Sequence, residues 1–294
     1  MPIPISEAVT EQAGVAAKKA RSMRSPAAYA VSTALAGAYV GVAVVLMLAA
    51  AGPLNADHSG ATKLVEGAVF GIALTLVVFA GAELYTGNTM TVVFGLFDRT
   101  RKIGIGSAVA LVVLSFFGNL IGGLIFSLLV EASGVLTVVA EPGKPPAMLE
   151  LLNSVAKAKA NESIEAMFFR GILCNFLVCL GVWMAARTRS DSAKLIVLFW
   201  ALLAFVTTGF DHVVANMTIL GLGLFSGSPG VTVGGYAANM LWVGLGNLVG
   251  GAVLVGAAYV TIARDERGDS IPDSAVPDNE GLRGHRETRE GAQA

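Results

Sequence analysis

The chain has 294 residues, of which 54% are apolar and only 14% are charged, whereas about a quarter of the residues in a soluble globular protein are charged. Its net charge of −1 argues against nucleic-acid binding, which needs a basic face. The two cysteines, Cys174 and Cys179, lie in one apolar segment, which excludes a disulfide framework and a cysteine metal site. These properties predict an all-α polytopic membrane protein.

The chain begins with a segment of mixed polarity, residues 1–25. It is too short and too polar to cross a membrane, which predicts an amphipathic helix lying on the cytoplasmic face, with a frayed leader as the alternative. A cleaved signal peptide fits poorly, because the following apolar core is too long and the leader carries Glu7 and Glu11.

Six long apolar stretches follow. A helix that crosses about 30 Å of hydrocarbon needs about 20 apolar residues. Crossings are therefore expected near 26–52, 64–97, 103–130, 163–187, 193–226 and 230–263. Together they form one transmembrane channel domain over 26–263. Residues 264–294 are rich in glycine, proline and charge, which predicts a disordered cytoplasmic tail.

Lysine and arginine alternate between the two sides of these crossings. They concentrate before residue 25, in 98–102, in 187–194 and after 263, and are sparse in the other connections. Because positive residues near helix ends stay cytoplasmic, both termini are expected on the cytoplasmic side.

A sequence repeat recurs at an offset of 128 residues. The matched pairs are Gly118-Asn119 with Gly246-Asn247, Glu83 with Asp211, and Asn88 with Asn216. The offset covers three crossings, an odd number, so the halves 26–130 and 163–263 enter the membrane from opposite sides. This predicts an inverted 3+3 repeat.

The second and fifth crossings are too long for one continuous helix. Each has about 30 apolar residues with a carboxylate near its middle, Glu83 or Asp211, which predicts two half-helices joined by a break. These carboxylates, with Asn88 and Asn216, are expected to support the breaks by accepting freed N–H groups of the following half-helix. A direct transport role is the second possibility. Paired breaks favour a channel or transporter over an enzyme.

His212 is the histidine that lies within a crossing. An ionisable group at that depth indicates a functional site, and imidazole titrates near neutrality, so it could hand a proton to a weak-acid anion. A hydrogen-bonded structural histidine is the alternative. The repeat places Thr86 at the other break, where its hydroxyl could orient the imidazole. The sequence has neither metal-ligand spacing around His212 nor a Walker-type phosphate loop, so no cofactor is expected.

Three stretches resemble the formate/nitrite transporter family: 81–90 (GAELYTGNTM), 170–180 (RGILCNFLVCL) and 209–217 (GFDHVVANM). With Gly246-Asn247 and the intervening spans, the resemblance covers roughly 1–263 and is greatest to the nitrite channel branch. It implies an aquaporin-like fold of six helices per subunit and a homopentamer in the bacterial plasma membrane, with a pore in each subunit.

The resemblance also implies roles for individual residues. Four apolar residues match constrictions on either side of a central chamber: Phe70, Leu74, Leu84 and Phe205. Thr86 matches a loop threonine that can switch position, and His212 matches the central histidine, with Asn175 and Asn247 near it. Lys159 matches the basic residue of the external vestibule.

Two departures from the family pattern blur the choice of substrate, Asp211 in place of glutamate and Tyr85 in place of phenylalanine. The expected mechanism concentrates an anion at Lys159 and protonates it at His212, so that a neutral acid crosses the apolar constrictions. Nitrite is the expected substrate, and a formate channel of the same family is the alternative.

Three further alternatives belong to other classes. An aquaporin-like channel for neutral solutes needs Asn-Pro-Ala at both breaks, and the sequence has none. A membrane enzyme using His212 and Glu83 as an acid/base pair would need more polar groups at mid-depth. A sensor that signals through its charged tail is the third.

Overall fold

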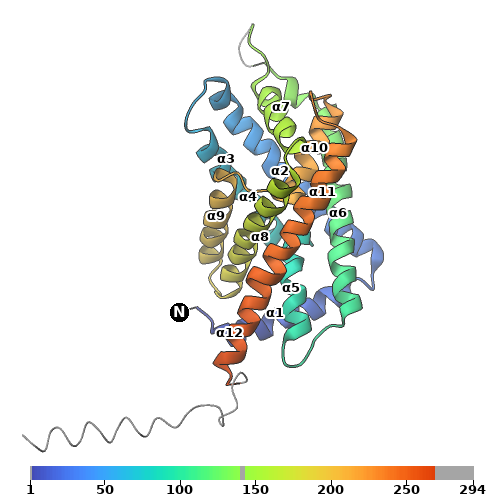
Figure 1. Ribbon diagram of the computed structural model, residues 1–294, viewed down its shortest axis with the longest axis vertical. Helices are drawn as coiled ribbons and strands as arrows, with labels where there is room; N and C mark the ends of the chain where they lie inside the picture. Colours follow the sequence, from blue (N-terminus) through green and yellow to red (C-terminus); the bar gives the residue numbers. More distant parts are fainter. Residues whose placement is uncertain (1, 140–142, 269–294) are drawn as a thin grey trace, which may run out of the picture.

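The computed structural model describes residues 2–139 and 143–268, and within them the regular structure is entirely helical. Figure 1 shows an elongated bundle with α1 at one end and α7 at the other. Most of the expected tail, residues 269–294, lies outside the described residues. The first residues of the expected tail, from Arg264 to Glu266, instead belong to the last helix, α12.

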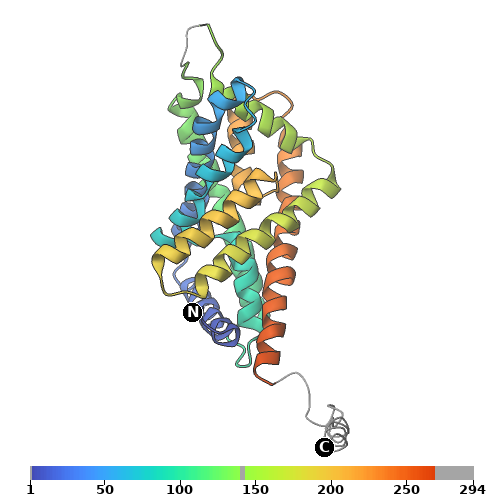
Figure 2. The ribbon, with the colours of Figure 1, turned by 90° about the vertical axis from the view of Figure 1, so that its left-hand side faces the viewer.

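Helix α1 (Ile5–Ser22) covers one end of the bundle. It lies across the ends of α5 and α12 in both views (Figures 1 and 2), and its buried face consists of small residues such as Ala13 and Ala16. The chain before it is tied to the end of α8, because Ile3 and Arg187 exchange two hydrogen bonds of 2.9 Å. The amphipathic segment is therefore a docked helix rather than a frayed leader.

Long helices form the body of the bundle. They are α2 (Pro26–Ala56), α6 (Ile105–Ala132), α8 (Ile164–Ala186) and a run of α11 (Val233–Val249), η2 (Gly250–Ala257) and α12 (Ala258–Glu266). Glycines let these helices touch backbone to backbone. A Cβ on Gly122 of α6 would lie 1.8 Å from Ala34 O of α2, and one on Gly246 of α11 would lie 2.2 Å from Phe168 O of α8.

The second and fifth expected crossings are both interrupted. The second comprises α3 (Thr62–Phe70), α4 (Ile72–Ala80) and α5 (Tyr85–Phe97), and the fifth comprises α9 (Asp191–Thr207) and α10 (Val213–Phe225). Each break starts at a glycine in the left-handed region, Gly81 at φ 79° and Gly209 at φ 78°, where a side chain would be strained. The further interruption at Gly71 was not expected.

The long connection after α6 is more ordered than the sequence suggested. It contains a short helix, η1 (Val135–Thr137), and then α7 (Ala147–Ala160), which buries Leu151 and Leu152 against the bundle. Helix α7 packs on α2 and α10, and Lys159 lies in its last turn.

Within the described residues, five helical stretches are long and apolar enough to cross a membrane. They are Pro26–Ala56, Thr62–Ala80, Ile105–Ala132, Ile164–Ala186 and Val233–Glu266. The fifth expected crossing falls short of this length because its break leaves helices of 17 and 13 residues. Helix α6 exposes apolar residues about every four positions: Ile105, Val109, Val113, Phe117, Ile121, Ile125 and Leu128.

Candidate functional site

The break before α10 is held by the amide of Asn247. Its Oδ1 accepts the Val213 N–H at 2.9 Å, and its Nδ2 donates to Asp211 O at 2.9 Å and Gly171 O at 2.7 Å. The side chain is fully buried. One amide from α11 therefore satisfies the first N–H of α10 and the Asp211 carbonyl in the break, and it ties both to the Gly171 carbonyl of α8.

The break before α5 is held in the same way by Asn119 of α6. Its Oδ1 accepts the Tyr85 N–H at 2.8 Å, and its Nδ2 donates to Glu83 O at 2.9 Å and Thr33 O at 2.8 Å. The sequence identified Asn119 as part of the repeat but did not reveal which groups it hydrogen-bonds.

The carboxylates of Glu83 and Asp211 do not accept these N–H groups, contrary to the expectation from the sequence. Each pairs with a lysine from a helix that caps one end of the bundle. Glu83 lies 2.7 Å from Lys19 of α1, and Asp211 pairs with Lys159 of α7. A lysine supplies a full charge, whereas the amide N–H offers only a partial one, and the asparagines already satisfy the amides.

The other two asparagines of the repeat, Asn88 and Asn216, lie beside these ion pairs. Lys19 Nζ donates to Asn88 Oδ1 at 2.9 Å, and Asn216 Nδ2 donates to Asp211 Oδ1 at 3.0 Å. The two pairs differ in burial, since the Asp211 side chain is 0% exposed and that of Glu83 is 17% exposed. Lys159, which the resemblance matched to the basic residue of the external vestibule, is thus paired with a buried carboxylate.

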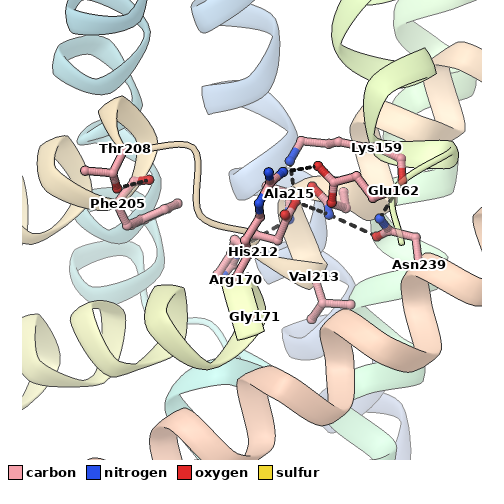
Figure 3. Close-up of polar contacts among 12 residues, drawn as sticks. Lys159, Glu162, Arg170, Gly171, Phe205, Thr208, His212, Val213, Ala215 and Asn239 are labelled. Atoms are coloured by element: carbon pink, nitrogen blue, oxygen red, sulfur yellow. Dashed lines mark hydrogen bonds and ion pairs between the residues drawn. The ribbon is translucent and has the colours of Figure 1, made fainter. Parts of the chain in front are cut away.

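His212 joins the two breaks. It is the N-cap of α10, where its Nδ1 accepts the Ala215 N–H at 3.2 Å, and its Nε2 lies 3.1 Å from Thr86 Oγ1 in the first turn of α5. Because Nδ1 is an acceptor, the hydrogen-bond network assigns a neutral ring with its proton on Nε2, donated to Thr86. Figure 3 shows His212 next to Ala215 at the start of α10.

A small cavity of about 70 Å³ lies on the α7 side of His212. Phe70 and Phe205 line it with His212, and their rings meet edge to face at 5.9 Å. Lys159 and Asn216 line the same cavity. Phe205 also lies 5.9 Å from the imidazole, so aromatic rings form the part of the cavity wall next to the histidine.

A larger cavity of about 550 Å³ opens on the α1 side. Leu74 and Leu84 line it together with Lys19, Glu83 and Gly87. The four apolar residues expected at constrictions are all buried, and they divide between the two cavities, the phenylalanines on the α7 side and the leucines on the α1 side.

Asn175 of α8 holds the chain behind Thr86. Its Nδ2 donates to Thr86 O at 3.3 Å, Thr89 Oγ1 at 3.0 Å and Asn247 O at 2.5 Å. In the part of the chain that the structure describes, neither Asn175 nor Asn247 hydrogen-bonds the imidazole. Both instead fix the backbone that carries Thr86 and His212.

The site contains charged residues that sequence reasoning did not assign to it. Lys19 was used only for orientation, and its contact with Glu83 spans 64 residues. Glu162 pairs with Arg170 beside Lys159, and Glu66 lines the small cavity. Their signal in the sequence is weak, since each lies at the edge of an apolar run. Among the described residues, no three His, Cys, Asp or Glu side chains gather as metal ligands.

Comparison with known proteins gives concordant results. A family model described as formate/nitrite transporter matches residues 6–261. The chain is 40% identical over 256 residues to the nitrite transporter NirC of Escherichia coli (strain K12), which covers 86% of this chain and 91% of that protein.

Two solved structures are similar. One is an FNT family ion channel, with a TM-score of 0.79, 39% identity, and coverage of 87% of this chain and 98% of that chain. The other is a pentameric formate channel with formate bound, with a TM-score of 0.67, 27% identity, and coverage of 81% and 98%.

Proposed function

Because this chain belongs to the formate/nitrite transporter family, we propose that it is a transmembrane channel for small monovalent weak-acid anions, with nitrite as its main substrate. Members of this family are channels or transporters, which points away from an enzyme. The observation that carries the proposal is the position of His212. It lines the small cavity and hydrogen-bonds Thr86, whose neighbour Gly87 lines the large cavity. Formate is the second candidate, because a formate channel with formate bound shares the fold.

The proposed architecture has six crossings in two inverted halves, 26–130 and 163–263. The support is the repeated hydrogen-bond pattern, in which Asn119 and Asn247 hold equivalent breaks at the same 128-residue offset. The segments 1–25 and 264–294 flank this domain on the cytoplasmic side. A homopentamer is supported by the pentameric relative and by the exposed apolar surface of α6.

The proposed location is the bacterial inner membrane with both termini cytoplasmic. The Lys and Arg distribution supports this orientation. It puts α1, which carries Lys19, on the cytoplasmic side and α7, which carries Lys159, on the external side, since these two helices lie at opposite ends of the bundle (Figure 1). Each mouth then offers a lysine to an arriving anion, and Glu83 and Asp211 hold these lysines beside the helix breaks.

The apolar residues exclude a bare anion. Its desolvation costs several kcal/mol even after relaxation, and Phe70 with Phe205 on one side and Leu74 with Leu84 on the other offer no charge to replace water. A neutral acid avoids most of this cost. A proton must therefore be given to the anion between the two constrictions and released beyond them.

His212 is the proposed proton donor to the anion. The neutral ring has its proton on Nε2, so it can give that proton away only when Nδ1 takes up another, which breaks the cap on the Ala215 N–H. Losing such a cap costs about 1 kcal/mol, and charging the buried ring costs further desolvation, which the charge of the arriving anion offsets. Thr86 holds Nε2 until the anion replaces it.

The test is uptake by purified protein in proteoliposomes, with nitrite and formate compared at two values of pH. We expect nitrite to move faster than formate and uptake of both to increase as the external medium becomes more acidic. Faster formate flux would make formate the main substrate. Flux of neither anion above that of empty vesicles would contradict the proposed function.

A further inference from the structure

A second carboxylate lies next to Asp211 at the α7 end of the bundle. Glu162 is in the short connection between α7 and α8, and Figure 3 shows it beside Lys159. Its side chain is 13% exposed, while that of Asp211 is 0% exposed. The two carboxyl groups lie within hydrogen-bonding distance of each other.

Each of these carboxyl groups is paired through one oxygen. Arg170 pairs with Glu162 Oε1, and Lys159 pairs with Asp211 Oδ1. The remaining oxygens, Glu162 Oε2 and Asp211 Oδ2, are buried and have no donor among the described residues. Ionised carboxylates only accept hydrogen bonds, so two neighbouring ones lack a donor until one of them carries a proton. The pair therefore has a place for one proton.

Glu162 is placed to exchange this proton with external water. Burial and the neighbouring charge of Asp211 raise the pKa of Glu162 to about 7, although Lys159 and Arg170 oppose the change. The charged and titratable groups around the pair come from each element packed against it: Lys159 on α7, Arg170 and Cys174 on α8, and His212 at the start of α10.

We infer that Glu162 and Asp211 hold one exchangeable proton between them, taken from the external medium, and that this proton sets the charge of the external mouth. With the proton bound, Lys159 and Arg170 face a single negative charge, so the four groups are net positive. Without it they are neutral. This inference rests on the proposed function for its consequence, which is that acid outside the cell strengthens anion binding at Lys159.

The expected effect is measurable. One unit of charge acting on an anion at roughly 10 Å, with an effective dielectric constant of about 20, changes affinity on the order of tenfold. Salt screens part of this effect. The KM for external nitrite is therefore expected to increase about tenfold between about pH 6 and about pH 8 at low ionic strength.

The proton itself can be tested without transport, by pH-difference infrared spectroscopy of the full-length protein in lipid. Wild type is expected to show a protonated carboxyl C=O band that disappears with a midpoint near neutrality. Glu162→Gln should remove that band, and Glu165→Gln, which changes an exposed acid in the first turn of α8, should keep it. Persistence of the band in E162Q, or its absence from wild type, would overturn the inference.

Nitrite uptake then tests the consequence. E162Q should keep the low KM of acidic medium at both pH values, whereas E165Q should follow wild type. A wild-type pH profile in E162Q would overturn the inference even if the protein carries nitrite. If no variant carries nitrite but the infrared band titrates and depends on Glu162, the proton site stands and the proposed function fails.

Folding of E162Q is checked by its elution in size-exclusion chromatography. A second variant tests the inference if E162Q does not fold. Glu162→Asp withdraws the carboxyl from Asp211 by one methylene. Its infrared midpoint should move to lower pH, and an unchanged midpoint would contradict the shared proton.

Discussion

The two helix breaks are built alike but differ at the residue that starts each following helix. In both, a buried asparagine from a long neighbouring helix satisfies the backbone, Asn119 before α5 and Asn247 before α10. The N-cap of α5 is Leu84, which makes no side-chain cap, and the N-cap of α10 is His212, which does. Because the amides hold the backbone, the N-cap residue is free to differ, and it is an apolar leucine at one break and an imidazole at the other.

The breaks also differ in how deeply their charges are buried. The pair Lys159–Asp211 has a fully buried carboxylate, whereas in Lys19–Glu83 the carboxylate side chain is 17% exposed. The Lys159–Asp211 pair is thus expected to be the more costly to disturb. This contrast leads to the predictions that follow.

The largest effect is expected from the asparagines. Asn247→Leu leaves the Val213 N–H and the Asp211 carbonyl without their partner, and each such buried group costs about 1–3 kcal/mol. We expect Asn119→Leu to destabilise the protein by a similar amount, on the order of 3 kcal/mol or more. Thermal unfolding in detergent measures both. A large loss in one variant and none in the other would show that the breaks are not equivalent.

Replacing Lys159 is expected to reduce stability more than replacing Lys19. Lys159→Met leaves Asp211 buried and unpaired, which typically costs about 3–5 kcal/mol. Lys19→Met leaves a carboxylate that water can reach, so its cost is expected to be about 1 kcal/mol or less. The comparison uses unfolding of both variants under the same conditions. Equal losses of stability would contradict the assigned difference in burial.

A smaller effect is expected from removing the hydrogen bond between Thr86 and His212, which joins the two breaks. Thr86→Val removes the acceptor of the His212 Nε2 proton and should reduce nitrite flux about tenfold or less, since one hydrogen bond contributes about 0.5–1.5 kcal/mol. Thr86→Ser, which keeps the hydroxyl, is the matched control and should retain most of the flux. If valine and serine behave alike, the hydroxyl has no role in holding the ring.

Much of this arrangement follows from the sequence, for identifiable reasons. The length of the apolar runs, the glycines at 81 and 209 and the 128-residue offset locate both breaks and the pairing of Thr86 with His212. The hydrophobic pattern does not reveal which distant polar groups meet. The contact of Lys19 with Glu83 and the neighbouring carboxyls of Glu162 and Asp211 depend on how α1 and α7 dock.

The connection that contains α7 also has features that the sequence did not reveal. No helix was expected in this connection, yet Leu151, Leu152 and Ala156 form a buried face. The resemblance to a known family located Lys159 but not its ion pair with Asp211. The charges that surround Lys159 therefore depend on how the chain folds.

The most direct test of the account is proton-coupled nitrite uptake by His212→Asn in proteoliposomes, followed with an internal pH indicator. Asparagine can still cap α10, so the variant should fold and assemble as wild type does. The account predicts that this variant loses proton-coupled uptake, and that His212→Phe loses it together with the cap. Wild-type nitrite uptake with an unchanged ratio of protons to nitrite in His212→Asn would contradict a proton donated by His212.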